Sequence, residues 1–240
     1  MTRVRRLGVV IPARDEEELI GECLASVLAA VRVADVPTSI VVVADGCLDA
    51  TAERARRFAG VEVVEVQSSN VGAARAVGVR HAIAAGADWI ANTDADSVVP
   101  AHWLARQLAV AERDVDVVVG TVRPDFTVLT IEHQDEWLSD HVPGEPNGHV
   151  HGANLGFRAS TYRAAGGYRP LPEHEDVDLV ARLATLGTLL ADDTAEVITS
   201  ARPFGRTPGG YARYLRERFP ARGTQAPETQ APVVQDSGIG

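Results

Sequence analysis

The sequence contains no lysine, so all 23 of its cationic side chains are arginine. It has only two cysteines, Cys23 and Cys47, which excludes a framework of disulfide bonds and predicts two reduced thiols. No stretch approaches the roughly 20 apolar residues that a membrane span requires. The apolar run after Arg3, Arg5 and Arg6 is too short for a signal peptide. These absences predict a soluble, cytoplasmic protein without a membrane span.

Net charge and length narrow the classes of function. The formal net charge is -10 over 240 residues, which argues against broad binding to nucleic acid or to anionic lipid surfaces. A small anionic ligand held locally by arginine and a metal ion is still compatible with this charge. A chain of this length can bury a substantial core and form one large α/β domain.

Strand and helix patterns alternate through the first half of the chain. Short apolar runs predict strands, and amphipathic or capped segments predict helices between them. The expected strands cover residues 7–11, 40–43, 61–66, 87–92 and 115–119. The expected helices begin at Asp15, Asp49, Asn70 and Pro100. The helix from Asp49 should end near Phe58, and the helix from Asn70 near Gly86. This alternation predicts an α/β fold with a mostly parallel central sheet and helices on both faces.

Acidic residues follow three of these predicted strands. Asp15 and Glu16 come after the first strand, Asp45 after the second, and Asp94 and Asp96 after the fourth. Ligands of such sheets bind at the carboxyl ends of the strands. We therefore expect three separate acidic loops to converge on one site.

The segment Thr93-Asp94-Ala95-Asp96 places two carboxylates at alternate positions after a buried strand. Alternate side chains of an extended chain point to the same side, and buried carboxylates need a compensating cation or water. Hard oxygen ligands in this position suit Mg2+ or Mn2+ that also binds a phosphate. Taken alone, the motif is equally compatible with a solvated acidic turn.

The alternation is lost in the second half. Residues 124–150 are polar and irregular, with a helix expected around residues 132–140. Residues 151–158 mix strand and turn patterns, Gly166-Gly167 predicts a turn, and residues 175–186 predict a helix. No internal repeat is visible.

The order of these motifs resembles glycosyltransferase family 2, whose members have the GT-A fold. The likeness covers roughly Val9 to Leu186 and rests on several motifs in sequence rather than on one match. The matching segments are Val10-Ile11-Pro12-Ala13-Arg14-Asp15-Glu16-Glu17, Val43-Ala44-Asp45-Gly46-Cys47-Leu48-Asp49, Asn70-Val71-Gly72-Ala73-Ala74-Arg75-Ala76-Val77-Gly78, Asp94-Ala95-Asp96, Gly152-Ala153-Asn154 with Phe157-Arg158, Gly166-Gly167-Tyr168, and Glu175-Asp176-Val177-Asp178-Leu179. The chain departs from the family pattern at Asp15, Ala44 and Cys47, where asparagine, aspartate and serine are usual.

The resemblance implies a Rossmann-like nucleotide-diphospho-sugar transferase fold and an enzymatic activity. The implied reaction is a metal-dependent, inverting transfer of a sugar from a nucleotide-diphosphate sugar to an acceptor hydroxyl. A UDP-sugar is the expected donor, with GDP- and dTDP-sugars as alternatives. Within a domain over residues 1–219, we expect a nucleotide-sugar-binding half up to about residue 122 and an acceptor-binding half over about 123–219. Residues 220–240 are rich in Pro, Gln, Thr and Gly and predict a disordered tail.

The resemblance also implies roles for residues of the matching motifs. Asp96 is implied to bind Mn2+ or Mg2+, which would neutralise the leaving diphosphate. The residues implied to bind the nucleotide sugar are Pro12, Ala13, Arg14, Glu16, Asp45, Arg75, Asp94 and Ala95. Gly152, Ala153, Asn154 and Glu175 are implied to lie beside the acceptor and the donor sugar. Glu16 also fits a first-turn acid favoured by the helix dipole, and Arg75 also fits a solvated helix face.

Asp176 is the expected general base. It begins a predicted helix among Glu173, Glu175 and Asp178, where crowded negative charge should raise the proton affinity of a carboxylate. In the related enzymes the aspartate of this Glu-Asp pair deprotonates the acceptor hydroxyl, which implies attack opposite the leaving group. For Asp178 a capping or first-turn role is the better interpretation.

Two arginines and two histidines give weaker hypotheses. Arg202 and Arg206 flank Pro203-Phe204-Gly205, and we expect them to close over the diphosphate when donor binds. His149 and His151 have the spacing of one strand face and could be metal ligands. A zinc site usually has more ligands than this, so a structural or acceptor-loop role is the better interpretation.

Three other classes of protein compete with this interpretation. A nucleotidyltransferase would show a Gly-rich loop with Arg and Lys after the first strand, and a haloacid-type phosphatase needs a lysine that this chain lacks. A non-catalytic nucleotide-sugar-binding relative is left open by the substitutions at Asp15, Ala44 and Cys47. The sequence identifies neither the sugar nor the acceptor.

Overall fold

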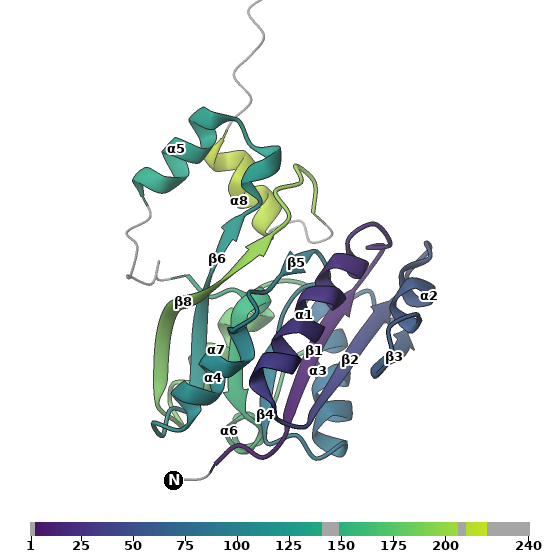
Figure 1. Cartoon of the computed structure of the whole chain (residues 1–240), viewed down its shortest axis with the longest axis vertical. Helices are drawn as coiled ribbons and strands as arrows, with labels where there is room; N and C mark the ends of the chain where they lie inside the picture. Colours follow the sequence, from purple (N-terminus) through teal and green to yellow (C-terminus); the bar gives the residue numbers. More distant parts are fainter. Residues whose placement is uncertain (1–2, 141–148, 206–209, 220–240) are drawn as a thin grey trace, which may run out of the picture.

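The computed structural model describes residues 3–140, 149–205 and 210–219, in which one sheet carries helices on both faces (Figure 1). The described strands are β1 (Leu7–Ala13), β2 (Thr38–Asp45), β3 (Val61–Val66), β4 (Trp89–Asn92), β5 (Ser97–Val98), β6 (Val117–Pro124), β7 (Leu155–Arg158) and β8 (Leu189–Thr199). The described α-helices are α1 (Ile20–Ala34), α2 (Thr51–Arg56), α3 (Val71–Ala84), α4 (Trp103–Ala111), α5 (Ile131–Ser139), α6 (Ala159–Ala164), α7 (Glu175–Leu183) and α8 (Tyr211–Arg218). Short 3-10 helices, η1 (Phe126–Val128) and η2 (Gly152–Asn154), precede α5 and β7.

The described strands pair in the order β3-β2-β1-β4-β7-β6-β8-β5. β3, β2, β1 and β4 run parallel to one another, and β6 runs parallel to β8. β7 is antiparallel to both β4 and β6, and β5 is antiparallel to β8. The parallel sheet expected from the alternating first half is therefore present, and each antiparallel pair includes β7 or β8, which come from the half where the alternation is lost.

The continuous apolar runs of β1 and β2 are buried on both faces of the sheet. In β1, Val9 and Ile11 join the core packed under α1 and α4, whereas Val10 joins the core under α3 and α7. This alternation is the period-2 pattern of a strand between two helical layers. Complete burial of such side chains contributes about 1.5–3 kcal/mol each, so these strands form the rigid base from which the following loops project.

Two of the four expected helix starts differ clearly from the structure. Asn70 does cap α3, since its side chain accepts from the N–H of Ala73 at 2.9 Å. Asp15 does not cap α1: its φ is 52°, its carboxylate accepts from the N–H of Leu48, and α1 begins five residues later. Asp15 lies in the bend after β1, and residues 17–19 form a turn before α1 begins. The helix expected at Pro100 begins three residues later, as α4.

Asp49 lies one residue before the N-cap of α2 and forms hydrogen bonds with the first residue of that helix. The Asp49 carboxylate accepts from the N–H and the hydroxyl of Thr51, while Ala50 is the N-cap. The helix is shorter than expected, because it ends at Arg56 rather than near Phe58. Likewise α7 ends at Leu183 rather than at residue 186.

The second half contains elements that the sequence did not predict. The helix expected around residues 132–140 is present as α5, but β8, α6 and α8 were missed. α5 and α8 lie together beyond the ends of β6 and β8 (Figure 1), where Trp137, Leu215 and Phe219 form a small core. The predicted boundary between the halves, near residue 122, falls inside β6. The predicted tail over 220–240 lies outside the described residues.

No helix among the described residues is both long and apolar enough to cross a bilayer.

Candidate functional site

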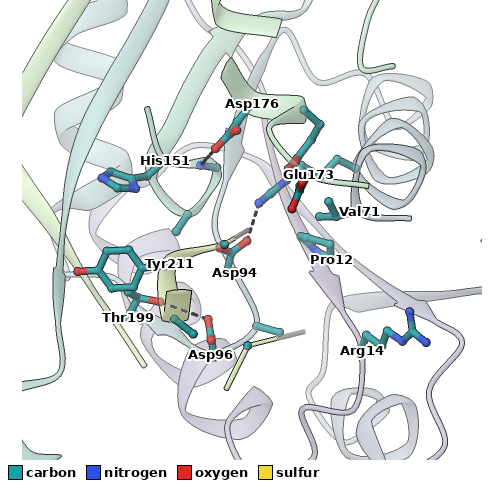
Figure 2. Close-up of a pocket in the computed structure, with 18 of the residues that line it drawn as sticks. Pro12, Arg14, Val71, Asp94, Asp96, His151, Glu173, Asp176, Thr199 and Tyr211 are labelled. Atoms are coloured by element: carbon teal, nitrogen blue, oxygen red, sulfur yellow. Dashed lines mark hydrogen bonds and ion pairs between the residues drawn. The ribbon is translucent and has the colours of Figure 1, made fainter. Parts of the chain in front are cut away.

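A cavity of about 460 Å³ opens at the carboxyl ends of the parallel strands. The three acidic loops expected to converge do meet there, together with residues from the second half. Of the predicted site residues, the cavity is lined by Pro12, Ala13, Arg14, Glu16, Asp45, Arg75, Asp94, Ala95, Asp96, Gly152, Ala153, Glu175 and Asp176, and Asn154 does not line it. The motifs that lie far apart in the sequence therefore share one cavity, which is drawn in Figure 2.

Asp94 and Glu175 are joined by Arg75 of α3. Arg75 donates from Nη2 to Asp94 at 2.5 Å and from Nε to Glu175 at 2.9 Å. Its side chain is 2% exposed, so the interpretation of a solvated helix face is wrong. Burial raises the pKa of Glu175 even though Arg75 opposes this. Burial alone would lower the pKa of Arg75, but the neighbouring acids outweigh it and raise that pKa. Arg75 therefore stays a cation.

Asp96 lies below Asp94 in Figure 2, beside the end of β8. Its Oδ1 accepts from the hydroxyls of Ser97 and Thr199, each at 3.3 Å. Burial, then the charges of Asp94 and Glu16, raise the pKa of Asp96 to about 6, with Arg202 opposing them. An all-oxygen set of donors with an excess of negative charge is what Mn2+ and Mg2+ prefer. The residues present therefore fit a divalent cation at Asp96.

Arg202 lies on the same acidic cluster. Its guanidinium donates to both carboxylate oxygens of Glu16, at 2.7 and 2.6 Å, and its Nη2 lies 3.0 Å from Asp96 Oδ2. Glu16 is 6% exposed and precedes α1, so it is a buried ion-pair partner rather than a first-turn acid. Arg206, the other arginine expected to close over the donor, lies outside the described residues.

The Asp45 carboxylate accepts hydrogen bonds from the loop that precedes α3. Both oxygens accept hydrogen bonds, from the N–H groups of Ser68, Ser69 and Asn70 and from the Ser68 hydroxyl, at 2.7–2.8 Å. Burial would raise the pKa of Asp45, but these four donors lower it overall. Asp45 therefore shapes the cavity wall ahead of α3, and its implied contact with the nucleotide sugar stays a prediction.

The end of β1 lies on the right of the cavity in Figure 2, where Pro12 and Arg14 are labelled. Ala13 is buried, Pro12 is half-buried and Arg14 is exposed. In the same view the Arg14 side chain points away from Asp94 and Asp96. Arg14 thus lies at the rim of the cavity rather than in the acidic centre.

Asp176 stands in the first turn of α7, above Asp94 in Figure 2. Its Oδ2 accepts from the N–H of Gly152 at 2.7 Å, and its Oδ1 accepts from the N–H of Val177 at 2.8 Å. His174, which precedes the helix, has a left-handed φ of 59° and makes no side-chain cap. Asp178 pairs with Arg169 and Arg182 outside the cavity, as expected for a structural role.

Gly152 permits this arrangement because it has no side chain. A Cβ at this position would meet the guanidinium of Arg75 at less than contact distance. Glycine at this position therefore leaves room for the Arg75 guanidinium, while the Gly152 N–H donates to Asp176. The next residue, Ala153, is buried and lines the cavity beside it.

Asn154 belongs to the core, in contrast to its expected place beside the acceptor and the donor sugar. Its Oδ1 accepts from Trp103 Nε1 at 2.8 Å, and its Nδ2 donates to the carbonyls of Thr121 and Ala195, each at 2.9 Å. It is 2% exposed. Asn154 thus ties η2 to α4, β6 and β8 beneath the cavity floor.

Aromatic side chains that the sequence analysis missed line the cavity on the side of the second half. Trp137, Tyr211 and Tyr214 were not expected here, and they lie with His149 and His151, whose spacing was noted in the sequence. The ring of Tyr211 lies 5.8 Å from those of His151 and Tyr214. Burial lowers the pKa of His151 to about 4, so this imidazole is neutral at pH 7. The two histidines predicted to share a face do lie together, with ring centroids 6.1 Å apart.

A second acidic cluster lies in the loops after β1 and β2. Among the described residues, Asp15, Cys47 and Asp49 offer ligand atoms within 4.8 Å of one another. Asp15 and Asp49 already accept backbone hydrogen bonds, from Leu48 and from Glu17 and Thr51. These carboxylates join the loops after β1 and β2, and metal binding at Asp96 stays a prediction.

Solved structures with a similar fold support this architecture. A mannosyltransferase from Pyrobaculum calidifontis, solved with GDP-Man and Mn2+, matches 86% of this chain with a TM-score of 0.65 and 24% identity. TarS 1-349 from S. aureus, solved with UDP-GlcNAc, matches 86% with a TM-score of 0.63 and 18% identity. The chain covers 59% and 61% of those two chains, respectively. These likenesses define a GT-A fold.

The sequence model of Glycosyl transferase family 2 matches residues 8–165. The chain therefore belongs to this family of transferase enzymes, as the motifs indicated. No curated protein matches it.

Proposed function

We propose that this protein is a metal-dependent, inverting glycosyltransferase that moves a sugar from a UDP-sugar to an acceptor hydroxyl. The observation that supports it best is the meeting of Asp94, Asp96 and Asp176 in one cavity, although Asp176 lies 80 positions beyond Asp96. Related folds solved with UDP-GlcNAc or with GDP-Man and Mn2+ are consistent with a nucleotide-sugar donor.

The donor is proposed to lie between the end of β1 and Asp96. Asp96 would hold Mn2+ or Mg2+, which as a Lewis acid would neutralise charge on the leaving diphosphate. Pro12, Ala13 and the loop held by Asp45 would enclose the nucleoside. The hydrogen bond from Arg75 holds the Asp94 carboxylate in place, where it would face the ribose or the sugar.

Asp176 is proposed to accept the proton of the attacking hydroxyl. The N–H of Gly152 holds its Oδ2, which fixes the carboxylate plane before any acceptor arrives. Each carboxylate oxygen has a second lone pair, so a hydroxyl can still donate to it. Positioned general bases of this kind contribute about 10²–10⁴-fold to a rate.

The acceptor is proposed to enter along the aromatic wall of Trp137, His151, Tyr211 and Tyr214. His151 and Tyr211 lie together at one side of the cavity in Figure 2. The His151 imidazole is neutral at pH 7, because burial lowers its pKa to about 4. Rings of this kind pack against apolar faces of a ligand while their polar atoms form hydrogen bonds. An uncharged acceptor fits this wall better than an anionic one.

Thermal unfolding with UDP, GDP and dTDP, each with and without Mn2+, tests the donor site. A ligand at a hundredfold over its dissociation constant stabilises the folded state by about 2.7 kcal/mol. We expect the largest stabilisation with UDP and Mn2+ together, its loss in Asp96→Asn, and its retention in Asp178→Asn, a surface carboxylate variant. Stabilisation by GDP instead of UDP would change the donor, and stabilisation by no nucleotide would favour the non-catalytic relative.

A further inference from the structure

Arg202 connects the two acidic loops that flank the expected metal position. It makes a two-point contact with Glu16, which follows β1, and one contact with Asp96, which follows β4. The side chains of Glu16 and Asp96 are 6% and 15% exposed. Such buried carboxylates need a cation nearby, and in the described structure a guanidinium supplies that charge.

The backbone around Arg202 is anchored, whereas its side chain lies at the cavity and is 24% exposed. The N–H of Ser200 donates to the carbonyl of Asp96 at 3.1 Å, and the N–H of Arg202 donates to the Ser200 hydroxyl at 3.3 Å. Arg202 also lines the cavity. The guanidinium can therefore exchange one anion for another by side-chain rotation while the strand end stays in place.

A divalent cation and this guanidinium compete for the same carboxylate. Arg202 Nη2 is 3.0 Å from Asp96 Oδ2, and two cations that share one carboxylate repel each other. A bare metal ion would have to displace Arg202 and leave it without an anion at Asp96. A nucleoside diphosphate removes this obstacle, because it supplies anionic oxygens to both the metal and the arginine.

We propose that Arg202 is a built-in cation that occupies Asp96 and Glu16 before donor arrives, so that the metal binds tightly only together with a nucleoside diphosphate. This inference rests on the proposed donor site and adds an order of events to it. By linkage, the factor by which the diphosphate strengthens metal binding equals the factor by which the metal strengthens diphosphate binding. Arg202 sets the size of that factor.

The inference is tested by titrating the full chain with Mn2+ and measuring free Mn2+ by electron paramagnetic resonance, with and without UDP. Wild type is expected to bind Mn2+ weakly alone and at least tenfold more tightly with UDP. In Arg202→Met, which keeps the apolar stem without the charge, Mn2+ alone is expected to bind at least tenfold more tightly than to wild type. That change corresponds to about 1.4 kcal/mol, and the coupling to UDP should shrink correspondingly.

Two further variants keep the result interpretable. Arg202→Lys keeps the charge needed for folding but loses the two-point contact, and a severalfold gain in affinity for Mn2+ alone is expected. Arg213→Met removes an arginine that pairs with Glu217 on the surface of α8 and should bind Mn2+ as wild type does. Circular dichroism confirms that each variant is folded.

Folded Arg202 variants that bind Mn2+ alone no more tightly than wild type would overturn the inference. Tighter binding of Mn2+ alone to Arg202→Met, without binding of any nucleotide, would support the role of Arg202 and contradict the proposed donor. Equal coupling to UDP in wild type and in Arg202→Met would support the donor site and overturn the role of Arg202. Failure of one proposal is thereby separated from failure of the other.

Discussion

Arg75 and Glu175 form a buried ion pair 2.9 Å long between positions 100 residues apart. Arg75 comes from α3, among the parallel strands, and Glu175 opens α7, which also carries Asp176. Through its second contact, to Asp94, the same guanidinium reaches the loop after β4. One side chain therefore fixes the distance between the aspartate-bearing loop and the proposed base.

Removing Arg75 is expected to destabilise the fold more than removing a surface arginine. Arg75→Met leaves Glu175 buried without its cation, a change that typically costs about 3–5 kcal/mol. Adding Glu175→Gln should recover part of this loss, because no uncompensated charge then remains at that position. Urea unfolding of the two single variants and the double variant measures the coupling energy.

Arg169→Met is the matched control for this experiment. Arg169 pairs with Asp178 while its side chain is 59% exposed, and exposed ion pairs contribute about 0–1 kcal/mol. A loss of stability in Arg75→Met no greater than in Arg169→Met would contradict the structural role of Arg75.

Neutralising Asp176 is expected to slow sugar transfer without weakening donor binding. If Asp176 is the base, Asp176→Asn should slow the transfer, or the slower hydrolysis of the donor by water, by about 10²–10⁴-fold. Its dissociation constant for UDP with Mn2+ should change less than threefold. Release of UDP from a UDP-sugar measures the first quantity, and isothermal titration calorimetry measures the second.

Asp178→Asn separates the loss of a base from the loss of a helix charge. Asp178 lies two positions further along α7 and pairs with Arg169 and Arg182, and its pKa is lowered by the hydrogen bond from Arg182. This variant should retain activity while losing some stability. Equal loss of activity in the two variants would mean that Asp176 acts through the helix start and not as a base.

The sequence predicted the first half well because local patterns determine it. The third expected strand has the bounds of β3, and Asn70 caps α3. Parallel strands covered by helices are near-continuous apolar runs, and caps have distinctive side chains. The predicted helix cap at Asp15 is wrong, because Asp15 has a left-handed φ and contacts Leu48, 33 positions away.

The second half shows what such patterns cannot reveal. β8 lies between β6 and β5 in the sheet, and its exposed positions weaken any apolar alternation. The order of the motifs correctly predicted that Arg75 and Glu175 line one cavity, but it did not predict their ion pair. It also placed Asn154 beside the ligand, where the structure has a hydrogen-bonded core residue. Such roles depend on tertiary contacts, which a single sequence does not specify.

Replacing Asn154 is expected to cost stability without a direct effect on donor binding. Asn154→Ala would leave Trp103 Nε1 and the carbonyls of Thr121 and Ala195 buried without their partner. An unsatisfied buried polar group costs about 1–3 kcal/mol, so a lower urea midpoint is expected. The dissociation constant for UDP with Mn2+, measured below the unfolding transition, should stay within about threefold of wild type. A large change in that dissociation constant with unchanged stability would instead indicate that Asn154 contributes directly to ligand binding.

His151 is expected to make the protein sensitive to acid. Burial lowers its pKa from 6.5 to about 4 in the folded state. Between these two values the unfolded state binds a proton that the folded state does not, so stability falls as the pH falls from 6.5 toward 4. The effect is of the order of 1–3 kcal/mol. Urea unfolding at pH 7, 6, 5 and 4.5 should show a shallower decline in His151→Asn than in wild type. His81→Asn, which removes a surface imidazole beside Glu62, is the control, and equal declines in wild type and His151→Asn would contradict the assignment.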